Sequence, residues 1–146
     1  MAKKNDILIL FTEEFPFSIG ETFIENEIEH LSINFERIYI VSKDLASNLK
    51  RPIPGNVTVI RKVFNLSKIE KLLSFFYVFK KDVVSEILNL KNYDLKISFH
   101  VIKYLFNTYS KSIKVKYFLE KFHSNLQNHE QLFIYSYWFM DEAIGI

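Results

Sequence analysis

Residues 6–42 read DILILFTEEFPFSIGETFIENEIEHLSINFERIYIVS, and this stretch decides the fold. It opens with a continuous apolar run at 6–12, a pattern typical of a strand that is buried on both faces. Residues 21–33 follow, and their apolar side chains recur at the three- and four-residue steps of a helix. A second apolar, β-branched run comes at 36–42. Strand, helix and strand at this spacing predict a parallel pair of strands joined by a crossover.

The loop between the first strand and the helix contains Pro16 and Gly20. Ser18 and Glu21 have the spacing of a capping box, in which Ser18 accepts from an early helical N–H and Glu21 reaches back. Ligands of open α/β sheets lie at the carboxyl ends of the strands, close to the following helices. We therefore expect this loop to face a ligand, with Gly20 allowing a close approach or a sharp turn. An ordinary strand-to-helix connection is the alternative.

The rest of the chain continues the same α/β alternation. Its pattern predicts a loop at 43–56, a third strand at 57–63, a helical region at 66–126 with breaks near 80–82 and 91–94, and a fourth strand at 132–138. The last residues resemble the first turn of a further helix capped by Asp141. The predicted fold class is thus α/β, with a Rossmann-like parallel sheet flanked by helices. Because a parallel sheet usually follows each helix with another strand, we expect residues 1–146 to be one domain that is truncated before its end.

Composition narrows the function classes. The net charge of +2 is too small to indicate a nucleic-acid partner. The absence of cysteine excludes disulfides and thiolate metal sites. The N-terminal apolar run is too short for a signal peptide, and the apolar segment at 72–79 is far shorter than the roughly 20 residues that span a bilayer. These features predict a cytoplasmic protein.

The loop and helix carry a spaced pattern, FP-x-x-x-GE-x-F-x-x-x-E-[IL], at Phe15, Pro16, Gly20, Glu21, Phe23, Glu27 and Ile28. With its flanking strands, this segment resembles the amino-terminal start of bacterial GT-B glycosyltransferases of family 4, which build capsular and other surface polysaccharides. The sequence IYSYW at 134–138 resembles a later strand of the same family. The resemblance covers both ends of the chain, whereas the helical middle is generic.

This resemblance implies that the chain is the incomplete, acceptor-side half of a GT-B fold. The implied activity is transfer of a sugar from a nucleotide-sugar donor to a glycan or lipid-linked acceptor. The nucleotide sugar would be a substrate held by a further, carboxy-terminal domain, and no cofactor is expected. No catalytic residue can be assigned, because the chain ends before the family's histidine-glycine segment. The chain alone is therefore expected to be inactive.

The resemblance also implies positions for individual residues. Gly20 and Glu21 would border the acceptor or the donor phosphates. Tyr137 and Trp138, at the carboxyl end of a strand, would lie on the same rim, where aromatic rings would stack on sugars. Packing against the core or between helices is the alternative for both aromatic residues.

A second candidate surface lies in the helical middle. If 96–126 is one helix, Lys96, Lys103, Lys114 and Lys121 point in nearly the same direction, roughly opposite the apolar side. A solvated face is the simplest interpretation, and attraction to anionic lipid is the alternative. The neighbouring segment at 71–81 places Phe75 and Phe76 between lysines, a composition that suits a membrane interface. The hypothesis predicts peripheral contact with the inner face of the plasma membrane.

Other function classes stay open. The chain could be a non-catalytic membrane- or glycan-binding module, or a gene remnant without function. A flavodoxin-like regulator is disfavoured because no aspartate follows the third strand. No metal site is expected, since the acidic pairs Glu13–Glu14 and Asp141–Glu142 are isolated in the sequence.

Overall fold

The computed structural model describes residues 5–43, 51–74, 81, 84–85, 88–89, 98–127 and 129–137. The elements within these ranges are β1 (Asp6–Thr12), α1 (Phe23–Asn34), β2 (Arg37–Ser42), β3 (Val57–Ile60), α2 (Lys68–Ser74), α4 (Phe99–Ser124) and β4 (Gln131–Ser136). Several predictions fall outside the described residues: the membrane-facing positions Phe75, Phe76 and Lys96, the rim residue Trp138, the helix break near 91–94, and the final helix with Asp141 and Glu142. Of the helix break predicted near 80–82, only Lys81 is described, and it is helical.

The four strands form one parallel sheet in the order β3-β2-β1-β4. β1 lies in the interior of the sheet, where Ile9 is opposite Tyr39 of β2 and Ile134 of β4. An apolar strand takes this position because its side chains are covered on both faces. The fold is therefore a Rossmann-like α/β sheet, as the sequence predicts.

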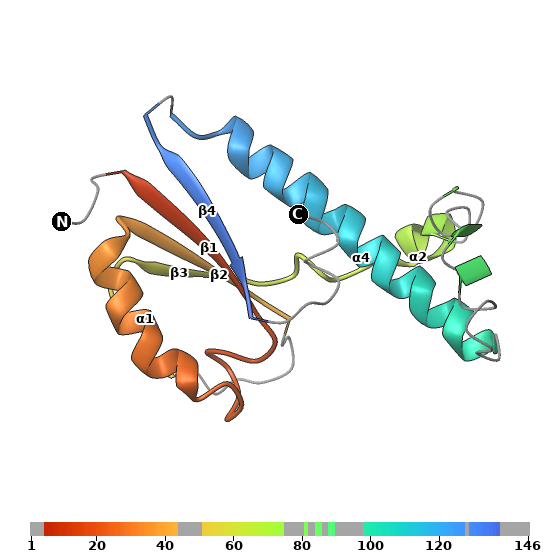
Figure 1. Cartoon of the computed structure of the whole chain (residues 1–146), viewed down its shortest axis with the longest axis horizontal. Helices are drawn as coiled ribbons and strands as arrows, with labels where there is room; N and C mark the ends of the chain where they lie inside the picture. Colours follow the sequence, from red (N-terminus) through yellow and green to blue (C-terminus); the bar gives the residue numbers. More distant parts are fainter. Residues whose placement is uncertain are drawn as a thin grey trace.

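A helix covers each face of the sheet (Figure 1). The face beneath α1 carries a buried cluster formed by Leu8, Leu10, Phe15, Ile24, Ile28, Ile38, Ile40 and Val57. The face beneath α4 carries a second cluster formed by Ile9, Phe11, Val41, Phe64, Val115 and Leu119. Alternate residues of β1 belong to opposite clusters because successive side chains of a strand point to opposite faces. The first half of α4 extends beyond the sheet, and α2 packs there (Figure 1).

The predicted capping box of α1 is wrong. The helix begins at Phe23, and the N-cap residue Thr22 makes no side-chain capping hydrogen bond. Glu21 has a φ of 55°, which lies in the left-handed region, so it cannot belong to the first turn of the helix. Glu21 instead turns its carboxylate back across the preceding loop.

Two other boundaries differ from the sequence prediction for backbone reasons. β3 ends at Ile60 rather than at residue 63, because Lys62 has a φ of 74° that no strand accommodates. α4 begins at Phe99 rather than at residue 96, because Ser98 is extended and its hydroxyl accepts from the N–H of Val101 at 3.4 Å.

Within the described part of the chain, no helix combines the length and apolar character that crossing a membrane requires.

Candidate functional site

The strand order places a topological switch point beside β1. The chain proceeds from β1 through β2 to β3 on one side, and β4 then adds on the other side of β1. The connection after β1 carries α1 over one face, while α4 lies on the opposite face before β4. Ligands of such sheets bind where neighbouring strands diverge in this way, at their carboxyl ends. Here that position is occupied by the β1–α1 loop, residues 13–22, and by the end of β4.

The carboxylate of Glu21 is the centre of the β1–α1 loop. Its oxygens accept hydrogen bonds from three consecutive backbone N–H groups, those of Glu13 at 3.1 Å, Glu14 at 2.8 Å and Phe15 at 2.8 Å. Convergent backbone N–H groups of this kind form an anion-binding concavity. In this chain the anion is a side chain of the same loop.

Gly20 makes room for a second carboxylate in the loop. The N–H of Gly20 donates to Oε2 of Glu14 at 3.1 Å. A Cβ atom on Gly20 would lie 2.4 Å from that oxygen, so the missing side chain leaves the space that Glu14 fills. No glycine in the described residues has a positive φ. Close approach, rather than a sharp turn, is therefore the reason for glycine at this position.

Arg51 binds the β1–α1 loop from a segment later in the chain, and this residue was not identified from the sequence. Its guanidinium donates to the carbonyl of Gly20 and to Oε1 of Glu25 at 2.9 Å, and it lies 4.7 Å from the centre of the Phe15 ring. Its backbone N–H donates to the carbonyl of Pro16 at 2.8 Å. No local pattern could have indicated these contacts, because Arg51 follows the loop by about thirty positions and lies in a predicted loop itself.

Tyr137 joins the end of β4 to α1. Its hydroxyl donates to the Glu27 carboxylate, and its ring packs edge-on against Phe23 with the ring centres 5.1 Å apart. Burial raises the pKa of the Tyr137 phenol well above its ordinary value, and the hydrogen bond to Glu27 and the negative charge of that carboxylate raise it further. Tyr137 therefore carries a neutral hydroxyl throughout the physiological range.

The residues that carry the family resemblance form one contact network. Glu21 binds the N–H of Phe15, while Phe23 and Glu27 contact Tyr137. Ile28, a residue of α1, is buried in the core cluster between that helix and the sheet. The two resembling segments, more than a hundred residues apart in the sequence, thus meet at the carboxyl edge of the sheet.

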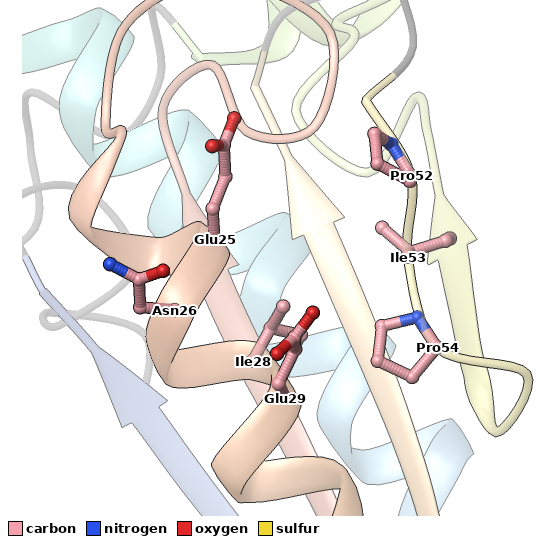
Figure 2. A pocket seen from close by; sticks show the side chains of 7 residues that line it. All are labelled: Glu25, Asn26, Ile28, Glu29, Pro52, Ile53 and Pro54. Carbon is pink, nitrogen blue, oxygen red and sulfur yellow. The ribbon is translucent and has the colours of Figure 1, made fainter.

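A groove runs beside this network, between α1 and the segment that leads into β3 (Figure 2). Its volume is about 490 Å³, and it is lined by Glu25, Asn26, Ile28, Glu29, Pro52, Ile53 and Pro54. The polar side chains come from the helix, and the opposite wall is the apolar Pro-Ile-Pro segment (Figure 2). Sequence reasoning missed the groove, because its two walls come from separate segments.

The lysines of the predicted stripe on α4 differ in their surroundings. Lys103 and Lys121 are exposed on α4. Lys114 is not part of a free stripe, because its ammonium pairs with Oε1 of Glu70 at 3.0 Å and donates to the carbonyl of Asn65. The two partners of Lys114 are Glu70 on α2 and Asn65 just before that helix, and the sequence alone did not indicate either contact.

Among the described residues, no group of three or more His, Cys, Asp and Glu side chains is arranged to hold a metal ion. No family model, curated protein or solved structure matches the chain significantly.

Proposed function

We propose that this chain is the acceptor-side part of a glycosyltransferase. The enzyme would transfer a sugar from a nucleotide-sugar donor to a glycan or lipid-linked acceptor in surface polysaccharide synthesis. The observation that carries the proposal is the meeting of the two family-like segments at the switch point, through the contacts of Phe23 and Glu27 with Tyr137. Switch points are the places where α/β sheets of this class bind their ligands.

In this proposal the edge residues and the adjacent groove bind the acceptor. Gly20, Glu21 and Tyr137 border the site, and Trp138 is assigned to the same rim by resemblance. The groove supports a saccharide ligand, because its carboxylate and amide groups match sugar hydroxyls and its Pro-Ile-Pro wall matches the apolar face of a sugar ring. The donor nucleotide would be bound by another domain, so the chain alone binds acceptor without transferring sugar.

The test is saturation-transfer NMR with oligosaccharides released from bacterial surface polysaccharides, compared with UDP-glucose. We expect saturation transfer to the oligosaccharides and little to the nucleotide sugar. Gly20→Trp should abolish the signal, since an indole at this position displaces Glu14 and protrudes into the site. Gly55→Trp is the matched control, because a Cβ atom at Gly55 meets nothing within 4 Å. Equal binding by both variants, with native circular dichroism, would remove the loop from the site.

A second candidate function, a non-catalytic membrane-binding module, is favoured by one feature of α4. Exposed Phe99 and Tyr117 are eighteen residues apart, as are exposed Lys103 and Lys121. Eighteen residues make five helical turns, so each pair points in one direction, and the two directions are close to each other. Aromatic and basic side chains on one helical face suit an anionic lipid surface.

This second function is tested by sedimentation with vesicles of anionic or zwitterionic phospholipid at low salt. The double variant Lys103→Glu, Lys121→Glu should lose any binding to the anionic vesicles. Lys116→Glu is the control, because Lys116 is exposed on another side of α4. Absence of wild-type binding to anionic vesicles at low salt would eliminate the membrane hypothesis.

A further inference from the structure

The loop after β1 is an anion-binding cradle that this chain fills by itself. Three consecutive N–H groups, at residues 13–15, converge on the two carboxylate oxygens of Glu21. Two of the three N···O distances are 2.8 Å, which is short for an N–H···O hydrogen bond and typical of one to a charged acceptor. In many α/β proteins, cradles of this type at this end of the sheet hold a ligand's phosphate.

The surrounding contacts hold Glu21 in this position. Its φ of 55° is uncommon for a residue other than glycine, and this conformation turns the side chain back across the loop. Glu14 accepts from the N–H of Gly20, the residue immediately before Glu21. Arg51 donates to the carbonyl of the same glycine and thereby ties the loop to the segment before β3. The placement of the carboxylate thus rests on several independent contacts.

We propose that Glu21 is a specificity-determining residue that acts as an internal anion. It fills the cradle and excludes phosphate and carboxylate ligands from the β1 end of the site, so that the group accepted there is a neutral polyhydroxy one. The naming of a sugar as that group rests on the proposed function, whereas the exclusion of anions rests on the loop alone.

The chemistry of the cradle explains the selectivity. An incoming phosphate would have to break three hydrogen bonds to a charged acceptor, and it would also meet the negative charge of Glu21 at close range. The Glu14 carboxylate, on the other side of Gly20, adds to this repulsion. A sugar hydroxyl meets no such barrier, because it carries no charge and needs none of the three N–H groups.

The probe for the test is inorganic phosphate, and the readout is the backbone amide spectrum of Glu13, Glu14 and Phe15. In the wild type these amide signals should not move as phosphate is added. In Glu21→Gly they should shift saturably, with an affinity at least about tenfold above any wild-type binding, because the three donors are vacated. Glycine keeps the backbone conformation of position 21, since it adopts a positive φ without cost. Glu120→Gln, which removes an exposed carboxylate of α4 far from the loop in the sequence, should behave as the wild type.

Phosphate should also raise the melting temperature of Glu21→Gly more than that of the wild type, since a ligand stabilises the state that binds it. If Glu21→Gly does not fold, Glu21→Asn takes its place, because asparagine tolerates a positive φ and lacks the length and the charge with which Glu21 fills the cradle. A phosphate-dependent shift of these amides in the wild type would overturn the proposal. The proposal would also be overturned if the variant at position 21 folds and its amide signals at residues 13–15 do not shift when phosphate is added. Saccharide binding is measured separately, so failure of the proposed function would leave the phosphate result unaffected.

Discussion

At the scale of single residues, the β1–α1 loop is organised by carboxylates that bind backbone N–H groups. Glu21 binds three of them and Glu14 binds that of Gly20. Such bonds matter because a buried or half-buried N–H that loses its partner costs more than the bond itself contributes. The identities of Glu14, Gly20 and Glu21 are thus set by close geometry rather than by polarity alone.

Gly20→Ala should destabilise the protein by about 1 kcal/mol, because the new Cβ atom displaces the Glu14 carboxylate and breaks its hydrogen bond to the N–H of residue 20. The cost stays modest because the displaced group is the end of a flexible side chain. Urea denaturation measures the change. Gly55→Ala should alter the free energy of unfolding by less than about 0.5 kcal/mol. Equal effects of the two substitutions would contradict this account of Gly20.

Tyr137→Phe should cost about 1 kcal/mol, because it removes the donor to Glu27 and keeps the ring contact with Phe23. Tyr135→Phe is the control, since Tyr135 is 43% exposed.

The raised pKa of the Tyr137 phenol adds a dependence on pH. A folded-state pKa above the ordinary value of 10.0 means that this contribution to stability is complete below pH 10 and declines as the pH rises further. Tyr137→Phe should therefore flatten the loss of stability in alkaline solution. An unchanged alkaline profile in thermal melts would argue against the burial of this hydroxyl.

At the scale of elements, the capping box that the sequence predicts for α1 does not form, whereas α2 begins with one. Ser67 and Glu70 at the start of α2 form reciprocal bonds: the N–H of Ser67 donates to Glu70 at 2.7 Å, and the N–H of Glu70 donates to the Ser67 hydroxyl at 3.2 Å. The same spacing at Ser18 and Glu21 forms no such pair. A four-residue pattern therefore identifies a candidate cap, and the backbone conformation between its ends decides whether it forms.

Glu70→Gln should remove an acid-sensitive contribution to the stability of α2. The hydroxyl and the N–H of Ser67, followed by Lys114, lower the pKa of Glu70 from 4.5 to about 2. Because the folded-state pKa is the lower one, the contribution is present above pH 4.5 and is lost as the pH falls towards 2. The difference in melting temperature between wild type and variant should shrink over this interval. Glu120→Gln, an exposed glutamate of α4, should show no such trend.

The sequence predicts the first three elements of the fold more accurately than the boundaries of the later ones. β1, α1 and β2 were predicted to within about two residues, because each is a short local pattern with a period of its own. The start of α4 and the end of β3 were not, since they depend on Ser98 as an N-cap and on the left-handed backbone of Lys62. Gly20, Glu21 and Tyr137 were singled out, but the N–H cradle, Glu14 and Arg51 were not, because their contacts join separate segments.

At the scale of the whole molecule, β1 is the strand around which the structure is built. It pairs with β2 on one side and β4 on the other, and its side chains enter the clusters beneath both α1 and α4. Burial on both faces, together with paired edges, makes a strand the last part of a sheet to open.

Hydrogen exchange should follow this arrangement. The amides of β1 should exchange most slowly, and those at the start of α4, which lies beyond the sheet, should exchange much faster. Mass spectrometry of peptides from 6–12 and 99–106 measures the contrast. Protection at the start of α4 equal to that of β1 would show that an interaction not visible in this fold covers the helix.

The sequence by itself determined the α/β class, because runs of apolar residues with strand and helix periods are local and follow from the chain's own geometry. The tertiary structure decided that β4 adds beside β1, that the Glu21 carboxylate binds the N–H groups of the loop after β1, and that a groove opens beside α1. These features depend on groups brought together from distant positions. Their energies arise from packing and hydrogen-bond geometry, which no short stretch of sequence contains.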